Sequence, residues 1–214
     1  MEQTRILVYL GEPLPYAVAQ EIYLDMIPAE GSYINAGIWT IRLEPVVTVT
    51  GQYYLYLPAG SGIGESTGFY RATPQVTLTI PSTAAKVITV GAYDQVYDSY
   101  ADFSGRGYAD STRTIGVAAA GLTKPDLVAP GVNIQAPDVY GSFTPVTGTS
   151  FATPIVSGAA ALLMEWGIVR GNDPFLYGEK VKAYLRRGAK PLPGYEERPN
   201  AESGYGILCT ANSL

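Results

Sequence analysis

The chain has 214 residues, a net charge of −5 and a sequence pI near 4.8. This length suits one domain with an appendage, or two small domains, and it is sufficient to bury a hydrophobic core. Because the net charge is negative and lysines and arginines form no runs, we expect no nucleic-acid partner. The longest apolar runs are much shorter than the roughly 20 residues of a membrane span, so we expect no membrane partner either.

Two further features of the sequence bear on the cellular compartment of the protein. The first residues lack the basic head and long apolar core of a secretory signal. The single cysteine, Cys209, excludes an internal disulfide and fits a reducing compartment.

Residues 1–76 are rich in tyrosine and β-branched residues. Short period-two stretches occur at 6–10, 39–43 and 53–57, and they look like short antiparallel strands. Prolines and glycines between these stretches leave little room for a helix. We therefore predict a β-rich first domain over residues 1–76, most simply part of a β-sandwich.

Residues 77–214 have an α/β pattern and are predicted to form a second domain. Residues 87–92 and 127–131 contain short buried-strand candidates. A helix is expected from Ser150 to about Trp166, and because nearly all its faces are apolar, it should lie inside the protein.

A second, amphipathic helix is expected from Pro174 to about Arg187. Asn172 or Asp173 would cap its start, Pro174 suits its first turn, and Gly188 would end it.

The segment from Gly148 places Thr149 and Ser150 at the start of the first predicted helix. Free amides and the helix dipole at such a position favour oxyanion chemistry, and Pro154 is expected in the first turn. A serine nucleophile also needs a general base, usually a histidine, and the chain contains no histidine. The alternative interpretation is that Ser150 is only a helix N-cap.

Residues 148–163 read GTSFATPIVSGAAALL and resemble the serine motif of the subtilisin-like serine proteases, or subtilases. Residues 124–131, KPDLVAPG, resemble the segment that precedes that serine. Residues 81–92 and 103–107 resemble the P-A-x-x-x-x-V-I-x-V-G-A and F-S-x-x-G strings of the family. The resemblance extends over roughly residues 77–208, in the order of the family, and implies the C-terminal part of a subtilisin-like fold, a parallel sheet with helices.

The resemblance implies a serine endopeptidase acting on a peptide or protein substrate, with no metal and no cofactor. Ser150 would be the nucleophile and its backbone amide an oxyanion donor, supported by Gly148, Thr149, Ala152 and Pro154 of the motif. The D-[ST]-G and H-G-T-x-V motifs that supply the aspartate and histidine of the triad are absent, as is the A-x-G-N asparagine. The chain therefore looks like a partial domain that is inactive alone.

The aspartates that are present match no triad position of the family. Asp126 is expected to make structural hydrogen bonds at a loop-to-strand junction.

Residues 1–76 resemble the tail of a jelly-roll insert found in the clostridial group related to the spore-germination subtilases. Localisation stays open between the cytoplasm and the spore. A parallel sheet without its other strands would have an unpaired edge, so we expect self-association or a separate N-terminal subtilase half as partner. Two alternatives remain: a pseudoprotease that uses the scaffold for protein interaction, and a β-sandwich binding domain supported by the α/β part.

Overall fold

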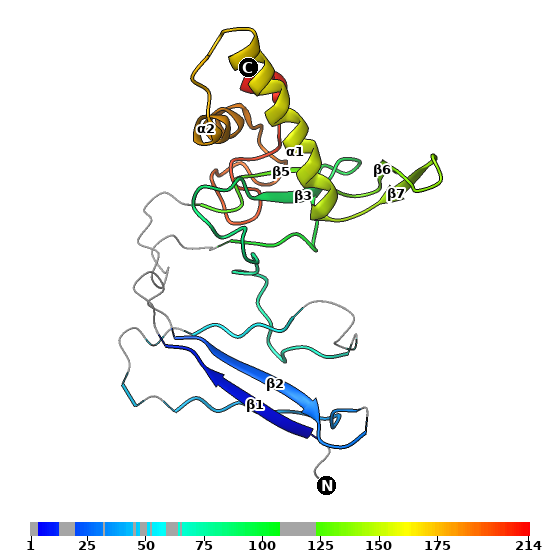
Figure 1. Ribbon diagram of the computed structural model, residues 1–214, viewed down its shortest axis with the longest axis vertical. Coiled ribbons are helices and arrows are strands. Elements are labelled where there is room, and N and C mark those ends of the chain that lie inside the picture. Colours follow the sequence, from blue (N-terminus) through cyan, green and yellow to red (C-terminus); the bar gives the residue numbers. More distant parts are fainter. Residues whose placement is uncertain are drawn as a thin grey trace. The chain divides into compact units, whose positions relative to one another are not determined.

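The structure is a computed structural model that falls into two compact units, one with the described residues up to Phe69 and the other with the described residues from Tyr70 on (Figure 1). The domain boundary at 76/77 stays a prediction. The structure describes residues 4–12, 20–31, 33–44, 46–47, 51, 53–58, 64, 66–107 and 123–214.

The first unit contains an antiparallel hairpin. Strand β1 (Thr4–Leu10) pairs with β2 (Ile22–Pro28), and the ring centroids of the facing Tyr9 and Tyr23 are 5.8 Å apart. This confirms the strand expected over 6–10.

The strands expected over 39–43 and 53–57 are wrong, because the structure assigns no strand to either segment. A local pattern alone does not make a strand, because a strand also requires a ladder of hydrogen bonds to a neighbouring strand. The jelly-roll character of this unit stays a prediction.

The second unit is built on a three-stranded sheet in the order β4-β3-β5. Strands β3 (Val90–Asp94) and β5 (Leu127–Pro130) are parallel, and β4 (Ser99–Tyr100) pairs antiparallel with the end of β3. The buried strands expected within 87–92 and 127–131 are thereby confirmed. A hairpin of β6 (Ile134–Pro137) and β7 (Phe143–Val146) follows β5 and was not predicted.

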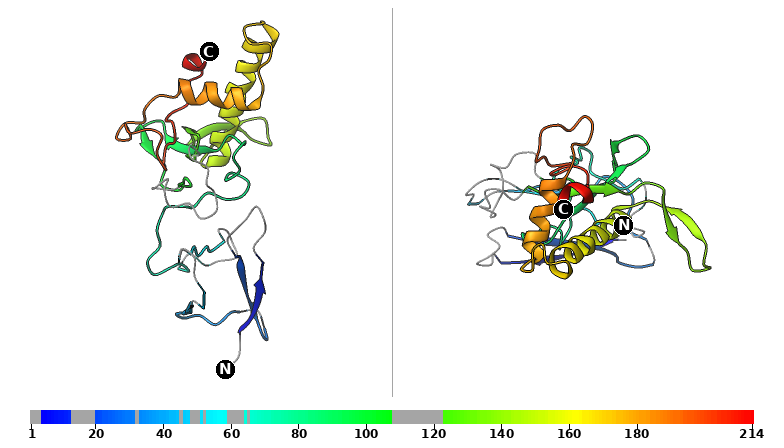
Figure 2. Two further views of the ribbon diagram at one scale, coloured as in Figure 1. Left: turned by 90° about the vertical axis from the view of Figure 1, so that its left-hand side faces the viewer. Right: turned by 90° about the horizontal axis from the view of Figure 1, so that it is seen from above.

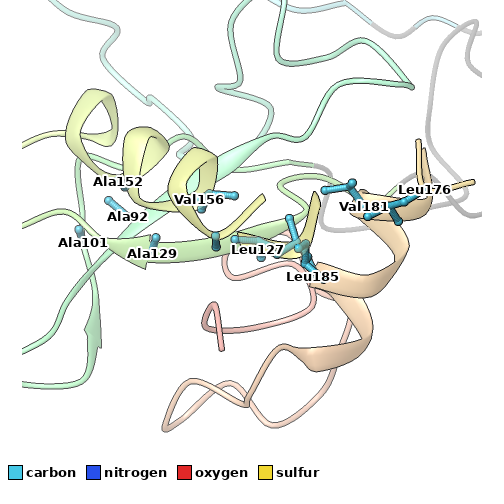
Figure 3. Close-up of a cluster of buried hydrophobic side chains, with 11 residues drawn as sticks. Ala92, Ala101, Leu127, Ala129, Ala152, Val156, Leu176, Val181 and Leu185 are labelled. Carbon is cyan, nitrogen blue, oxygen red and sulfur yellow. The ribbon is translucent and has the colours of Figure 1, made fainter. Parts of the chain in front are cut away.

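Helix α1 (Thr149–Met164) contacts β3 and β5 and continues as a π-helical turn, η1 (Glu165–Val169). Figure 3 shows Ala152 and Val156 among the side chains of the buried cluster that also holds Ala92, Ala129 and Leu127 of the sheet. The expectation that the whole helix lies inside is wrong. Its buried residues are Ala152, Val156, Ala159 and Leu163, which lie on one face.

The other face of α1 is exposed because the sheet and α2 contact the helix from the buried side. Leu162 and Met164 are 54% and 47% exposed, and Ser157 and Gly158 are exposed too. Together α1 and η1 form a stretch of 21 residues that is, by length and composition alone, long and apolar enough to cross a membrane. Its packing against β3 and β5 identifies it as a core helix of this unit.

Helix α2 (Gly178–Gly188) contacts α1 at a steep angle (Figure 2), and the short α3 (Thr210–Ser213) packs against α2. The expected end at Gly188 is confirmed. The expected start is wrong, because Tyr177 is the N-cap and residues 172–176 form a turn. The side chain of Asp173 binds Lys180 Nζ at 2.8 Å, and the amide of Asn172 donates to Trp166 O at 2.8 Å, so neither side chain caps the helix.

Candidate active site

Ser150 is the second residue of α1. The N-cap is Gly148, with φ 151° and ψ 158°, and it makes no side-chain capping bond. The interpretation of Ser150 as an N-cap is therefore wrong: its backbone is already helical. A glycine suits this cap because its φ lies where L-residues are rarely found.

The Gly148 turn is attached to the carboxyl end of the parallel strands. Gly148 N donates to Gly131 O at 2.8 Å, and Gly131, the residue after β5, donates to Tyr93 O of β3 at 3.0 Å. A Cβ on Gly131 would lie 2.6 Å from Ala92 Cβ, so only glycine allows this approach. Ser150 thus begins its helix beside the edge at which ligands bind in many open α/β sheets.

Gly131 is the residue of the site whose role sequence reasoning missed. The signal was present as a Pro130-Gly131 pair at the end of a buried strand. Its tertiary partners, Tyr93 and Gly148, lie 38 residues before and 17 residues after it, and no local pattern connects the three.

The first amides of α1 point out of the helix start without an intrahelical acceptor. Phe151 N and Ala152 N reach Gly148 O at 3.1 and 3.4 Å. The amides of Thr149 and Ser150 have no hydrogen-bond acceptor among the described residues. Together with the positive end of the helix dipole, these amides can bind a negatively charged oxygen.

Two motif residues fix the start of the helix from opposite sides. Ala152 is fully buried within the core cluster. Pro154 is exposed and is the sixth residue of α1, so the expectation that it lies in the first turn is wrong, because the helix begins one residue earlier than predicted. Without an N–H, Pro154 leaves the carbonyl of Ser150 without its helical donor.

The hydroxyl of Ser150 is on an exposed residue and has no hydrogen-bond partner among the described residues. The other hydroxyls of this helix face differ. Thr153 Oγ1 donates to Thr149 O at 2.9 Å, and Ser157 Oγ donates to Thr153 O at 3.1 Å. Ser150 is thus accessible and not engaged in the helix, but the described residues bring no base to it.

Asp126 is confirmed as a structural residue. Its side chain is fully buried one position before β5, and Oδ2 accepts the backbone N–H of Thr89 at 2.6 Å. No group of three or more histidine, cysteine, aspartate or glutamate side chains that could hold a metal occurs in the described part of the chain.

Fold and site together define an α/β scaffold that presents an exposed serine at the start of a core helix, next to the carboxyl ends of two parallel strands. The profile of the subtilase family, peptidase S8, matches residues 61–206. The chain belongs to the subtilase family.

Serine protease AprX of Bacillus subtilis is 33% identical in an alignment 158 residues long, which covers 64% of this chain and 32% of AprX. The structure of the Clostridium perfringens CspB protease has a TM-score of 0.77 and 35% identity, covering 99% of this chain and 42% of CspB. The structure of the prenylagaramide maturation protease PagA has a TM-score of 0.51 and 33% identity, covering 65% of this chain and 46% of PagA. The chain thus spans less than half the length of each of these relatives.

Proposed function

We propose that this chain supplies the nucleophile of a subtilisin-type serine endopeptidase and is inactive by itself. The observation that carries the proposal is the geometry of Ser150, an exposed serine at the start of α1 with the amides of Thr149 and Ser150 open beside it. Membership of the subtilase family supports peptide-bond hydrolysis as the reaction.

In this reaction Ser150 Oγ forms a bond to the scissile carbonyl carbon, and the carbonyl oxygen becomes an oxyanion. The amide of Ser150 donates a hydrogen bond to that oxyanion, with the dipole of α1 adding to the stabilisation. The C–N bond then breaks, the amine leaves with a proton, and water hydrolyses the acyl-enzyme.

The hydroxyl proton of Ser150 must pass to a base during the attack, and the amine must receive one. The chain has no histidine to perform either transfer. We infer that the base and its aspartate come from a segment equivalent to the part of CspB that this chain does not span. Loss of triad members lowers the rate by roughly four to six orders of magnitude, so the chain alone should have no measurable turnover.

The test is covalent labelling with a fluorophosphonate probe. The chain alone should label weakly or not at all. After co-folding with the N-terminal half of a subtilase that carries the D-[ST]-G and H-G-T motifs, Ser150 should become labelled. Ser150→Ala should abolish the labelling, whereas Ser157→Ala, which removes another exposed serine of α1, should leave it unchanged.

Two results would count against the proposal. One is turnover of casein by the chain alone that Ser150→Ala abolishes, since this would mean that another base acts on Ser150. The other is failure to label in a demonstrably folded complex. That second result favours the alternative function, a pseudoprotease that binds other proteins. The exposed apolar residues of α1 also support this alternative.

We also propose that the first unit is part of a jelly-roll insert of the spore-germination type. The likeness to CspB supports this, because it covers 99% of this chain, including the residues before 61, where the family match begins. A crystal structure of the complete domain tests it: β1 and β2 should then belong to one of two packed sheets of a jelly roll. A hairpin that joins no two-sheet sandwich would reject it.

A further inference from the structure

A cluster of buried charges lies away from Ser150, around Asp126. Three cations surround its single carboxylate. Lys124 Nζ is 2.9 Å from Oδ2, Lys182 Nζ is 3.2 Å from Oδ1, and the Arg186 guanidinium also binds Oδ1. Each of the three cationic side chains is at most 17% exposed. Among the described residues, the cluster therefore holds two more positive than negative charges.

Uncharged oxygens, two backbone carbonyls and one hydroxyl, accept hydrogen bonds from the two lysines without neutralising them. Lys124 Nζ donates to Val87 O at 2.7 Å and to Thr89 Oγ1 at 2.8 Å. Lys182 Nζ donates to Ala85 O at 2.7 Å and to Val87 O at 2.9 Å. Unbalanced buried charge is costly, because carbonyl oxygens replace the hydration shell but not a counter-ion.

The guanidinium of Arg186 makes hydrogen bonds through only two of its three nitrogens among the described residues. Its Nε donates to Asp126 Oδ1 at 2.8 Å, and Nη2 binds the same oxygen. Its Cζ lies 4.8 Å from the centre of the Tyr205 ring. Nη1 has no hydrogen-bond partner among the described residues, so one side of the fork stays open.

A half-open pocket of about 220 Å³ adjoins this cluster, between α2 and the segment around Ala85. Lys182 and Arg186 line it, together with Lys86, Glu179, Ala85 and Ala183. Lys86 Nζ lies 3.9 Å from Glu179 Oε1 at the rim, where the two side chains are 83% and 52% exposed. The pocket thus combines three cations with one carboxylate.

The lowered pKa of Lys182 also indicates that the cluster lacks negative charge. Burial lowers the pKa of its ammonium from 10.5 to about 8; Asp126 opposes this shift, while the nearby Lys124 and Arg186 add to it. An anion in the pocket would offset the repulsion among the three cations.

We propose that this pocket binds a small oxyanion, either a phosphate or a carboxylate, between Lys86 and the open side of Arg186, with Lys182 contributing charge from the pocket wall but no further hydrogen bond. Planar and tetrahedral oxyanions both accept hydrogen bonds from a guanidinium fork, and a lysine adds charge without a fixed geometry. The pocket is large enough for inorganic phosphate or for the carboxylate of an acidic side chain. None of its lining residues belongs to the Ser150 site.

The experiment titrates the full chain with inorganic phosphate in one arm and acetate or citrate in the other, with chloride at matched ionic strength as control. Binding is measured by calorimetry and by the thermal midpoint. If phosphate binds saturably and chloride does not, the pocket is a phosphate site. If acetate or citrate binds saturably and chloride does not, the pocket is a site for carboxylate groups. Absence of saturation in both arms would overturn the proposal.

Variants at the rim make the test specific without touching the buried cluster. Exposed charge pairs contribute up to about 1 kcal/mol, so Lys86→Gln should weaken binding about two- to fivefold. Glu179→Gln should strengthen it by a similar factor. Arg187→Gln, which removes an exposed charge from the same helix outside the pocket, should change nothing. If Arg187→Gln weakens binding as much as Lys86→Gln does, the effect is one of net charge and not of the pocket, and the proposal fails.

Discussion

At the scale of single residues, Ser150 and Asp126 differ in what surrounds them. Ser150 is exposed and has no hydrogen-bond partner among the described residues, whereas Asp126 is fully buried and in contact with Lys124, Lys182 and Arg186. An exposed, unengaged hydroxyl suits a nucleophile that another group must activate. A buried carboxylate bound by three cations suits a structural role that ties α2 to the start of β5.

The buried ammonium of Lys182 predicts a pH dependence of stability. Its pKa is about 8 in the folded chain, whereas an exposed lysine, as in the unfolded chain, has a pKa of 10.5. Between these values the unfolded chain holds more protons, so the free energy of unfolding should rise with pH, by at most about 1.4 kcal/mol per pH unit. Burial raises the pKa of Tyr93 and Tyr100 above 10, so these tyrosines make the free energy of unfolding fall as the pH rises above 10. The rise caused by Lys182 should therefore be measured between about pH 8 and pH 10.

Urea unfolding at several pH values measures this rise. Lys182→Met should remove it, while Lys86→Met, which removes an exposed lysine nearby, should keep it. An equal rise in the wild type and in Lys182→Met would show that another group is responsible.

At the scale of elements, helix α1 is positioned by the glycine contact between its cap and the sheet. Gly131 lies between the Gly148 turn and Ala92 of β3, with a hydrogen bond to each side. This contact determines where the helix begins, and hence where Ser150 lies. The helix propensity of residues 149–164 would allow a start at any of several positions.

Gly131→Ala should destabilise the second unit, because its Cβ would come within 2.6 Å of Ala92 Cβ and 3.2 Å of Gly148 O. Overpacking of this kind costs about 1–3 kcal/mol. Denaturant unfolding measures the loss, and labelling of Ser150 in the co-folded complex should fall as well.

The matched control is Gly158→Ala in α1, where an added Cβ meets nothing within 4 Å. Alanine in a helix interior is favoured over glycine by about 0.5–1 kcal/mol, so this variant should be more stable than the wild type. If Gly131→Ala unfolds at the same denaturant concentration as the wild type, the contact does not position the helix as argued.

At the scale of the whole molecule, apolar surface remains uncovered in both units. In the second unit it includes Leu162, Met164, Ile168 and Val169, and in the first unit Tyr9, Leu10, Tyr23 and Ile22 of the hairpin. Helices usually cover a parallel sheet on both faces.

We expect the isolated chain to self-associate, because large exposed apolar patches favour association. Light scattering should give a mass above 22.8 kDa, and a dye that binds apolar surface should fluoresce. Co-folding with an N-terminal subtilase half should reduce the dye signal. A compact monomer that does not bind the dye and melts cooperatively would contradict both the association and the partial-domain argument.

The sequence by itself determined the family, the placing of Ser150 near the start of a helix, two buried strands and most of the extent of α1. All of these depend on short motifs and local periodicity, which can be recognised without knowing what the chain packs against. The absence of histidine, and with it the absence of a triad base, was likewise visible from the residues alone.

Only the tertiary structure decided how Ser150 is positioned and which faces are buried. The link from Tyr93 through Gly131 to Gly148, and the meeting of Lys182 and Arg186 at Asp126, join residues 17 to 60 positions apart. Residues 39–43 and 53–57 have a strand-like pattern but are not assigned as strands, and α1 is apolar all round but buried on one face. Pairing and burial depend on the neighbours that the fold supplies, and a local pattern does not contain those neighbours.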